Sequence, residues 1–66
     1  MTRAERENWI INIDNTASVI ETAIGAGTVD FVLRKYGAKS IDDISDSDLS
    51  EVFSELYAIE ADLRSD

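Results

Sequence analysis

The side chains able to do chemistry in this 66-residue chain are carboxylates, hydroxyls and a few cations, because histidine and cysteine are absent. This absence excludes zinc sites built from cysteine or histidine, thiol nucleophiles, histidine bases and disulfide frameworks. Carboxylates can act as an acid and base pair only where a pocket separates their pKa values, and 66 residues can hardly enclose one. No serine has an obvious base partner. We expect a protein that is not an enzyme and that uses no metal or cofactor.

Two segments resemble ligand-binding motifs but lack their defining residues. Residues 25–30 read Gly-Ala-Gly-Thr-Val-Asp, yet they follow a helical pattern instead of a strand, and Asp30 stands where a dinucleotide fingerprint needs glycine. Residues 42–48 alternate Asp with Ser and Ile, but they lack the mid-loop glycine and closing glutamate of a calcium loop. We interpret the first segment as a turn between helices and expect the second to bind cations weakly and without selectivity.

The formal net charge of −8 belongs to the second part of the chain. Residues 1–39 hold five basic and five acidic residues, whereas residues 40–66 hold nine acidic residues and one arginine. This acidity argues against a nucleic-acid partner, because phosphate binding depends on Lys and Arg. No apolar run is long enough to span a membrane, and the first residues do not resemble a secretory leader. We therefore expect a cytoplasmic protein.

The spacing of apolar residues predicts one all-α domain over residues 1–66, a three-helix bundle-like fold. The helices are expected at about 3–24, 29–36 and 46–64, with a single helical turn near 41–44. Thr2 and Glu5 form a capping box, Thr28 is expected to cap the second helix, and Ser45 or Asp46 the third. Asp43 stands at the capping-box position after Ser40. The expected core comprises Trp9, Ile13, Ala17, Ile20, Ile24, Val29, Val32, Leu33, Tyr36, Ile41, Ile44, Leu49, Val52, Phe53, Leu56, Ile59 and Leu63.

Acidic residues share one flank of the last predicted helix and continue into the segment before it. This acidic stripe consists of Asp42, Asp43, Asp46, Asp48, Glu51, Glu55 and Asp62. It is interpreted either as a solvated, well-capped helix face or as a docking surface for a basic protein. Glu60 departs from the pattern because it projects toward the apolar side, where an unpaired charge is costly. It is interpreted either as reaching water near the helix end or as a buried ion pair that fixes the helix register or a dimer contact. Arg64, one turn later, is a candidate partner, and Arg34 or Lys35 are the others.

The first predicted helix carries an uncharged seam opposite its core face. The seam residues recur at alternating steps of four and three, as in a heptad, and are Ala4, Asn8, Ile11, Asn15, Ser18 and Thr22. Arg3, Glu7, Asp14 and Glu21 follow one border of the seam. The seam is either plain surface or a second packing surface, in which asparagine sets the register.

The second half of the chain also bears a resemblance. Residues 32–44, Val-Leu-Arg-Lys-Tyr-Gly-Ala-Lys-Ser-Ile-Asp-Asp-Ile, place a short helix, a glycine turn and a second cap in sequence. Residues 29–64 thereby resemble small uncharacterised helix-turn-helix and helix-extended-helix modules of phage and conjugative-element proteins. In nucleic-acid-binding members of such folds, the phosphate contacts would correspond to Arg34, Lys35 and Lys39.

Three functions follow as hypotheses. The first is a protein–protein interaction module that self-associates, as a homodimer, through the seam of the first helix. The second is an acidic mobile-element inhibitor whose stripe imitates nucleic-acid phosphates and occupies a basic groove on a host enzyme. The third is weak DNA binding through the three cations of the resemblance.

Overall fold

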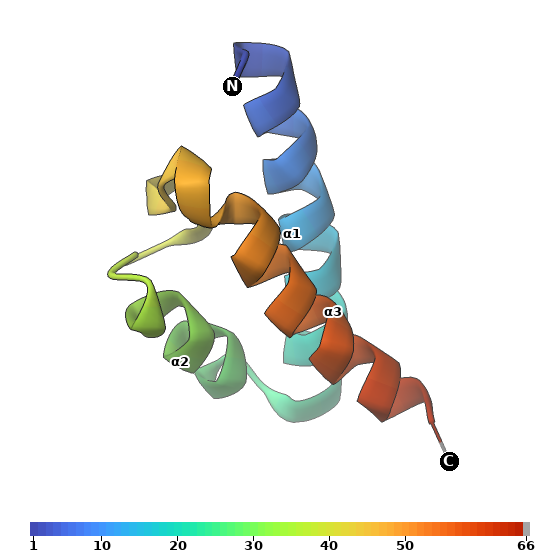
Figure 1. Cartoon of the computed structure of the whole chain (residues 1–66). Helices are drawn as coiled ribbons and strands as arrows, with labels where there is room; N and C mark the ends of the chain where they lie inside the picture. Colours follow the sequence, from blue (N-terminus) through green and yellow to red (C-terminus); the bar gives the residue numbers. More distant parts are fainter. Residues whose placement is uncertain (66) are drawn as a thin grey trace.

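The computed structural model describes residues 1–65, and within them the chain folds into three α-helices and two short 3-10 helices. The elements are α1 (Arg3–Ile24), α2 (Gly27–Lys35), η1 (Ile41–Asp43), η2 (Asp46–Asp48) and α3 (Leu49–Arg64). Helices α1 and α3 run side by side in the same direction, and α2 lies next to them on one side (Figure 1). The predicted all-α fold with three helices and a helical turn near 41–44 is confirmed.

The ends of α1 follow from local chemistry. The Thr2 hydroxyl accepts a hydrogen bond from the Glu5 N–H at 3.1 Å, and the Glu5 carboxylate accepts from the Thr2 N–H at 3.2 Å. These bonds satisfy two donors that the first turn leaves free, which confirms the capping box. At the other end Gly25 has φ +92°, a conformation that side-chain-bearing residues rarely adopt. The helix therefore stops at the predicted glycine.

The predicted starts of the other two helices were wrong by two or three residues. Helix α2 begins at Gly27 after Ala26, so Thr28 lies within the first turn and does not cap it. Residues 46–48 form a 3-10 turn, and α3 begins at Leu49 with no side-chain cap from Ser45 or Asp46. Asp43 accepts from the Lys39 N–H at 3.1 Å, and Ser40 makes no side-chain cap bond. Asp46 and Asp43 bind other partners, the Arg6 guanidinium and the Lys39 N–H, in place of the expected caps.

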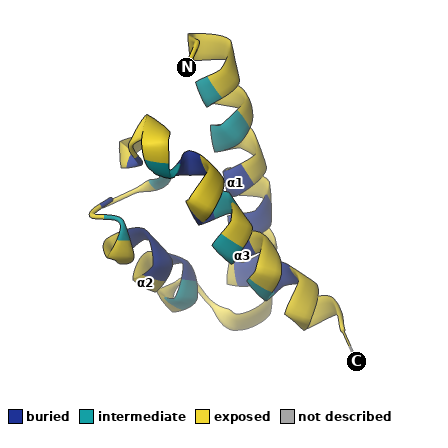
Figure 2. Cartoon of the chain, in the orientation of Figure 1, coloured by how far each residue is buried: buried dark blue, intermediate teal, exposed yellow. Residues whose placement is uncertain are grey.

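The core lies where the three helices face one another (Figure 2). Its buried apolar residues are Ile13, Ala17, Ile20, Val29, Val32, Leu33, Ala38, Ile44, Leu49, Val52 and Leu56. Trp9, Tyr36, Ile41, Phe53 and Ile59 pack against this core but are only partly buried. Ile24 and Leu63 were wrongly predicted as core, because they lie near the ends of α1 and α3 and are 52% and 39% exposed. No helix within residues 1–65 has the length and apolar character needed to cross a membrane.

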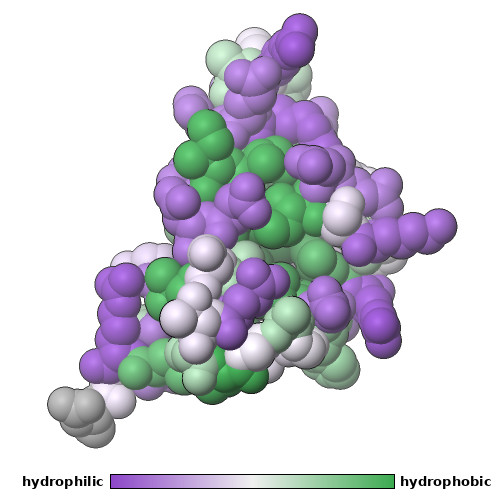
Figure 3. Space-filling view, turned by 180° about the vertical axis from the view of Figure 1, so that it is seen from behind, coloured by the Kyte–Doolittle hydropathy of each residue, from purple (hydrophilic) through white to green (hydrophobic). Residues whose placement is uncertain are grey.

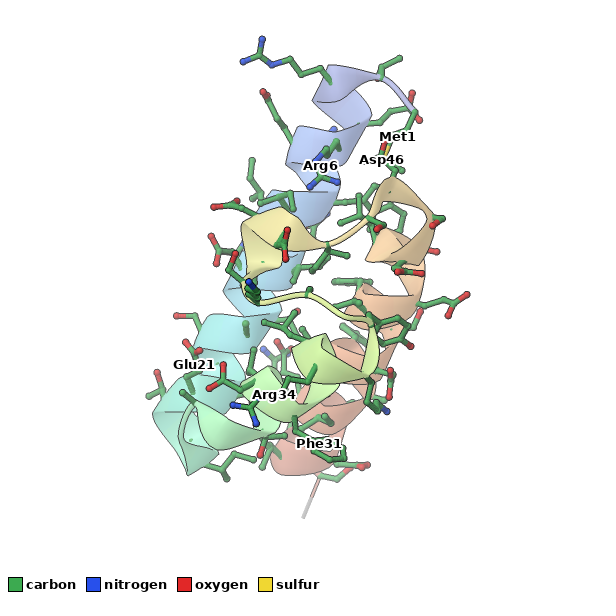
Figure 4. All side chains as sticks on the ribbon, turned by 90° about the vertical axis from the view of Figure 1, so that its left-hand side faces the viewer. Met1, Arg6, Glu21, Phe31, Arg34 and Asp46 are labelled. Atoms are coloured by element: carbon green, nitrogen blue, oxygen red, sulfur yellow. The ribbon has the colours of Figure 1, made fainter. Side chains whose placement is uncertain are left out.

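Arg6 ties the segment between α2 and α3 to the start of α1. Its guanidinium donates to the Ile44 carbonyl at 2.8 Å, the Asp46 carboxylate at 2.7 Å and the Asp42 carbonyl at 2.9 Å. Figure 4 shows this side chain reaching from α1 to the segment that carries Asp46. Two of the three acceptors are backbone carbonyls, so Arg6 holds the backbone of residues 42–46 against α1.

Candidate functional site

The α1 seam faces solvent along its whole length. All six seam residues are exposed, while Ile13, Ala17 and Ile20 on the opposite side of the helix are buried. Ile11, the one large apolar member, is 56% exposed. Seen from behind, where α1 lies nearest the viewer, hydrophobic surface shows between hydrophilic side chains (Figure 3). The structure therefore leaves this face of α1 without a partner in residues 1–65.

The two borders of the seam differ in charge. Glu7, Asp14 and Glu21 lie on one border and are exposed, and Arg3 pairs with Glu7 at 3.2 Å. Glu5, Asn12 and Val19 lie on the other border, also exposed, and Glu5 is engaged in the N-terminal cap of the helix. From Asn8 onward, the seam and this second border form an uncharged surface on a chain of which 30% is charged.

A hollow lies beside Ile11, between α1 and η1. It has a volume of about 390 Å³ and is lined by Ile10, Ile11, Arg3, Arg6, Glu7 and Asp42. Its lining combines two isoleucines with side chains of both charge signs. The hollow lies on the acidic border of the seam, because Glu7 and Ile11 belong to both.

The acidic stripe is divided between internal contacts and solvent. Asp46 binds Arg6, Asp43 accepts from the Lys39 N–H, and Glu55 binds two residues at the end of α2. Asp42, Glu51 and Asp62 are exposed, and Asp48 is half-buried. About half of the predicted docking surface therefore holds the fold together.

Glu55 forms the polar contact between α2 and α3. Its carboxylate accepts from the Lys35 ammonium and, at 2.5 Å, from the Tyr36 hydroxyl. These two donors hold the pKa of Glu55 below its ordinary value of 4.5. The same carboxylate, together with burial, raises the pKa of Tyr36 to about 12. Both directions favour the ionised carboxylate beside the neutral phenol, so this contact is stable across neutral pH.

Glu60 is buried, with 8% of its side chain exposed, and its carboxylate lies 3.0 Å from the Arg64 guanidinium. The interpretation that Glu60 reaches water was wrong, and of the candidate partners Arg64 is the one that pairs with it. The alternative partner Lys35 binds Glu55 instead. Because Arg64 is 67% exposed, the pair joins a buried carboxylate to a solvated cation one turn away.

The cations of the resemblance lie around α2. Arg34, Lys35 and Lys39 are all exposed, but Lys35 is engaged by Glu55 and lies 5.8 Å from the Phe31 ring. Figure 4 shows Phe31 and Arg34 on the outer side of α2. Phe31 is 65% exposed. These residues form a mixed aromatic and basic surface, separate from the seam.

Trp9 and Phe53, both predicted as core residues, form an aromatic cluster with Tyr57, which the sequence did not lead us to expect. The Trp9 ring meets Phe53 edge to face at 5.8 Å, and Phe53 lies 5.7 Å from Tyr57, which is 52% exposed. The spacing of Phe53 and Tyr57, four residues apart on one helix, was the available signal.

Comparisons of the chain with protein families, with curated proteins and with solved structures found no match to any of them.

Proposed function

We propose that this protein is a non-enzymatic protein–protein interaction module that self-associates through the α1 seam. The observation that carries the proposal is the uncharged, exposed face of α1. Between Asn8 and Ile20 the only charged side chain is Asp14, in a chain of which 30% is charged. A helix face that meets only water ordinarily mixes charges along its length.

Size supports the same proposal. A domain of this length builds a small core, and comparable scaffolds without disulfides or metals often gain stability by association. Burying an isoleucine fully is worth about 1.5–3 kcal/mol, so covering the exposed half of Ile11 gains roughly 1 kcal/mol in each copy. The other seam residues are small or polar and add little apolar area. This gain is small beside the entropic cost of association, so we expect a weak dimer.

Sedimentation equilibrium of the wild type and of Ile11→Glu tests this proposal. A carboxylate at position 11 must be desolvated at the interface, so the dissociation constant should rise by about tenfold or more. Phe31→Glu is the matched control, because Phe31 is equally apolar, 65% exposed and on another helix. The proposal fails if the wild type is monomeric at high micromolar concentration, or if both variants weaken association equally.

The second candidate is an acidic mobile-element inhibitor that imitates nucleic-acid phosphates on a basic groove of a host enzyme. It rests on Asp42, Glu51 and Asp62, exposed carboxylates that make no ion pair within residues 1–65. Binding of a basic protein should weaken steeply with salt and should be lost when these three acids become Asn or Gln. Capture that survives the triple substitution removes this candidate.

Weak DNA binding through a helix-extended-helix surface is the third candidate. Arg34 and Lys39 are its remaining cations, since Lys35 binds Glu55. Two cations on a chain of net charge −8 give little attraction for phosphates, so we rank this function last. A mobility shift at low salt that disappears in Arg34→Gln/Lys39→Gln would instead favour it.

A further inference from the structure

The two borders of the α1 seam determine how two copies can pair. In a heptad frame Asn8, Asn15 and Thr22 occupy the a positions, and Ala4, Ile11 and Ser18 the d positions. The flanking g positions are then Glu7, Asp14 and Glu21, all acidic and exposed. The flanking e positions are Glu5, Asn12 and Val19. Glu5 is already engaged by the N-terminal cap of its own helix.

An antiparallel pair would bring like borders together. In that arrangement the g positions of one helix lie next to the g positions of the other, whatever the register. When the seam is centred on Ile13, Glu7 faces Glu21 of the second copy and Asp14 faces Asp14. Arg3 is the one cation near this border, and it lies at the far end from Asp14, paired with Glu7. The centre of an antiparallel interface would therefore hold two facing carboxylates with no cation to neutralise them.

A parallel pair separates these charges. Each g position then faces an e position of the second copy, so Glu7 meets Asn12 and Asp14 meets Val19. The a and d layers pair like with like, which places Ile11 against Ile11 and Asn15 against Asn15. Facing asparagines can hydrogen-bond to each other, and a polar residue at an a position fixes the register at some cost in stability.

We propose that two copies of this chain pair with their α1 helices parallel and in register, about a twofold axis that follows the seam. This inference rests on the proposed self-association and specifies its geometry. The buried face of α1, against which α3 and α2 pack, lies opposite the seam, so the rest of each copy points away from the axis. The hollow beside Ile11 lies on the acidic border, where Asn12 of the second copy would approach its rim.

Single-cysteine variants test the orientation, because the chain contains no cysteine. Ala4→Cys and Thr22→Cys place thiols at opposite ends of the seam, about 27 Å apart along the helix. Ser54→Cys, an exposed position on α3, measures disulfides formed by random collision. Each full-length variant is equilibrated in a glutathione redox buffer at a concentration where the wild type is dimeric. Disulfide-linked dimers are then quantified by non-reducing electrophoresis.

The parallel arrangement predicts that Ala4→Cys and Thr22→Cys each form homodimeric disulfides well above the Ser54→Cys background, since facing positions come within disulfide range. An antiparallel dimer would give neither homodimer, but a mixture of the two variants would form the mixed disulfide. That result overturns the proposed orientation and leaves self-association intact. If every variant forms disulfides only at the Ser54→Cys background level and the wild type is monomeric, both self-association and the parallel orientation are overturned.

Asp14→Asn provides a second readout that requires no cross-link. In the parallel dimer Asp14 faces Val19, so removing its charge should change the dissociation constant by less than about threefold. Tightening by about tenfold or more would indicate that Asp14 had faced another carboxylate, and would contradict the parallel arrangement. Asn is close to Asp in size and shape, so α1 should remain folded, which far-UV circular dichroism can verify.

Discussion

Replacing Arg6 with methionine should release the segment between α2 and α3 from the start of α1. Arg6 makes three hydrogen bonds, to the carbonyls of Asp42 and Ile44 and to the carboxylate of Asp46. Methionine keeps a long apolar stem beside Ile10 but provides no donor. The two carbonyls must then rely on water, and the turn between η1 and η2 keeps only its apolar contacts with the core, through Ile41 and Ile44.

The magnitude follows from the geometry. Hydrogen bonds from a charged group contribute about 1.5–3 kcal/mol each when buried, and neutral ones about 0.5–1.5. The Arg6 side chain is 31% exposed and the Asp46 side chain 54%, so water replaces part of what is lost. We expect a loss of about 2 kcal/mol in the free energy of unfolding. For a domain of this size that corresponds to a fall in Tm of roughly 10 °C.

Urea unfolding, followed by far-UV circular dichroism and by the fluorescence of Trp9, measures this loss. Arg3→Met is the matched control on the same helix, because the Arg3 side chain is 94% exposed and pairs only with Glu7. Such a surface pair is worth less than about 0.5 kcal/mol. If the free energy of unfolding of Arg6→Met also lies within about 0.5 kcal/mol of the wild-type value, Arg6 does not hold the segment and the prediction is wrong.

Three further predictions concern charge and the seam. Glu60→Met should leave the stability unchanged or raise it, whereas Arg64→Met, which strands a buried carboxylate, should cost about 1 kcal/mol in urea unfolding. Because the pKa of Glu55 is lowered on folding, its contribution to the free energy of unfolding is full above pH 4.5 and is lost as the pH falls below that value. Glu55→Gln should therefore flatten the decline in Tm over this acid range. An unchanged slope of Tm against pH would contradict the assignment. Asn15→Ile should tighten the dimer by about tenfold in sedimentation equilibrium, because an apolar a position replaces a polar one, and an unchanged affinity would place Asn15 outside the interface.

Periodicity predicted the helices because it reports which side of each helix is buried. The repeat of Ile13, Ala17 and Ile20 identified the inner face of α1, and the glycines at 25 and 37 marked the helix ends. The prediction for the start of the last helix was wrong because a long-range partner competes with a local cap. Asp46 was expected to cap the last helix, but its carboxylate binds Arg6, 40 residues earlier in the chain. That competition depends on tertiary packing, which a local pattern does not contain.

The same distinction applies to the candidate site. The exposure of the α1 seam could be predicted, because a face opposite a core face must point outward unless another element covers it. Which carboxylates of the acidic stripe make internal contacts could not be predicted from the sequence. Glu51 and Glu55 share one flank of α3, yet only Glu55 meets Lys35 and Tyr36. Which carboxylate is used depends on where α2 ends against α3.

The α1 seam as a self-association surface is tested most directly by the mass of the wild-type protein in solution. Sedimentation equilibrium from about 10 µM to about 1 mM covers the concentrations at which a weak dimer begins to form. We predict that the average mass rises with concentration from the chain mass of 7.3 kDa toward twice that value, and that Ile11→Glu holds it near 7.3 kDa. A wild-type mass that stays at 7.3 kDa over the whole range would contradict the proposed function.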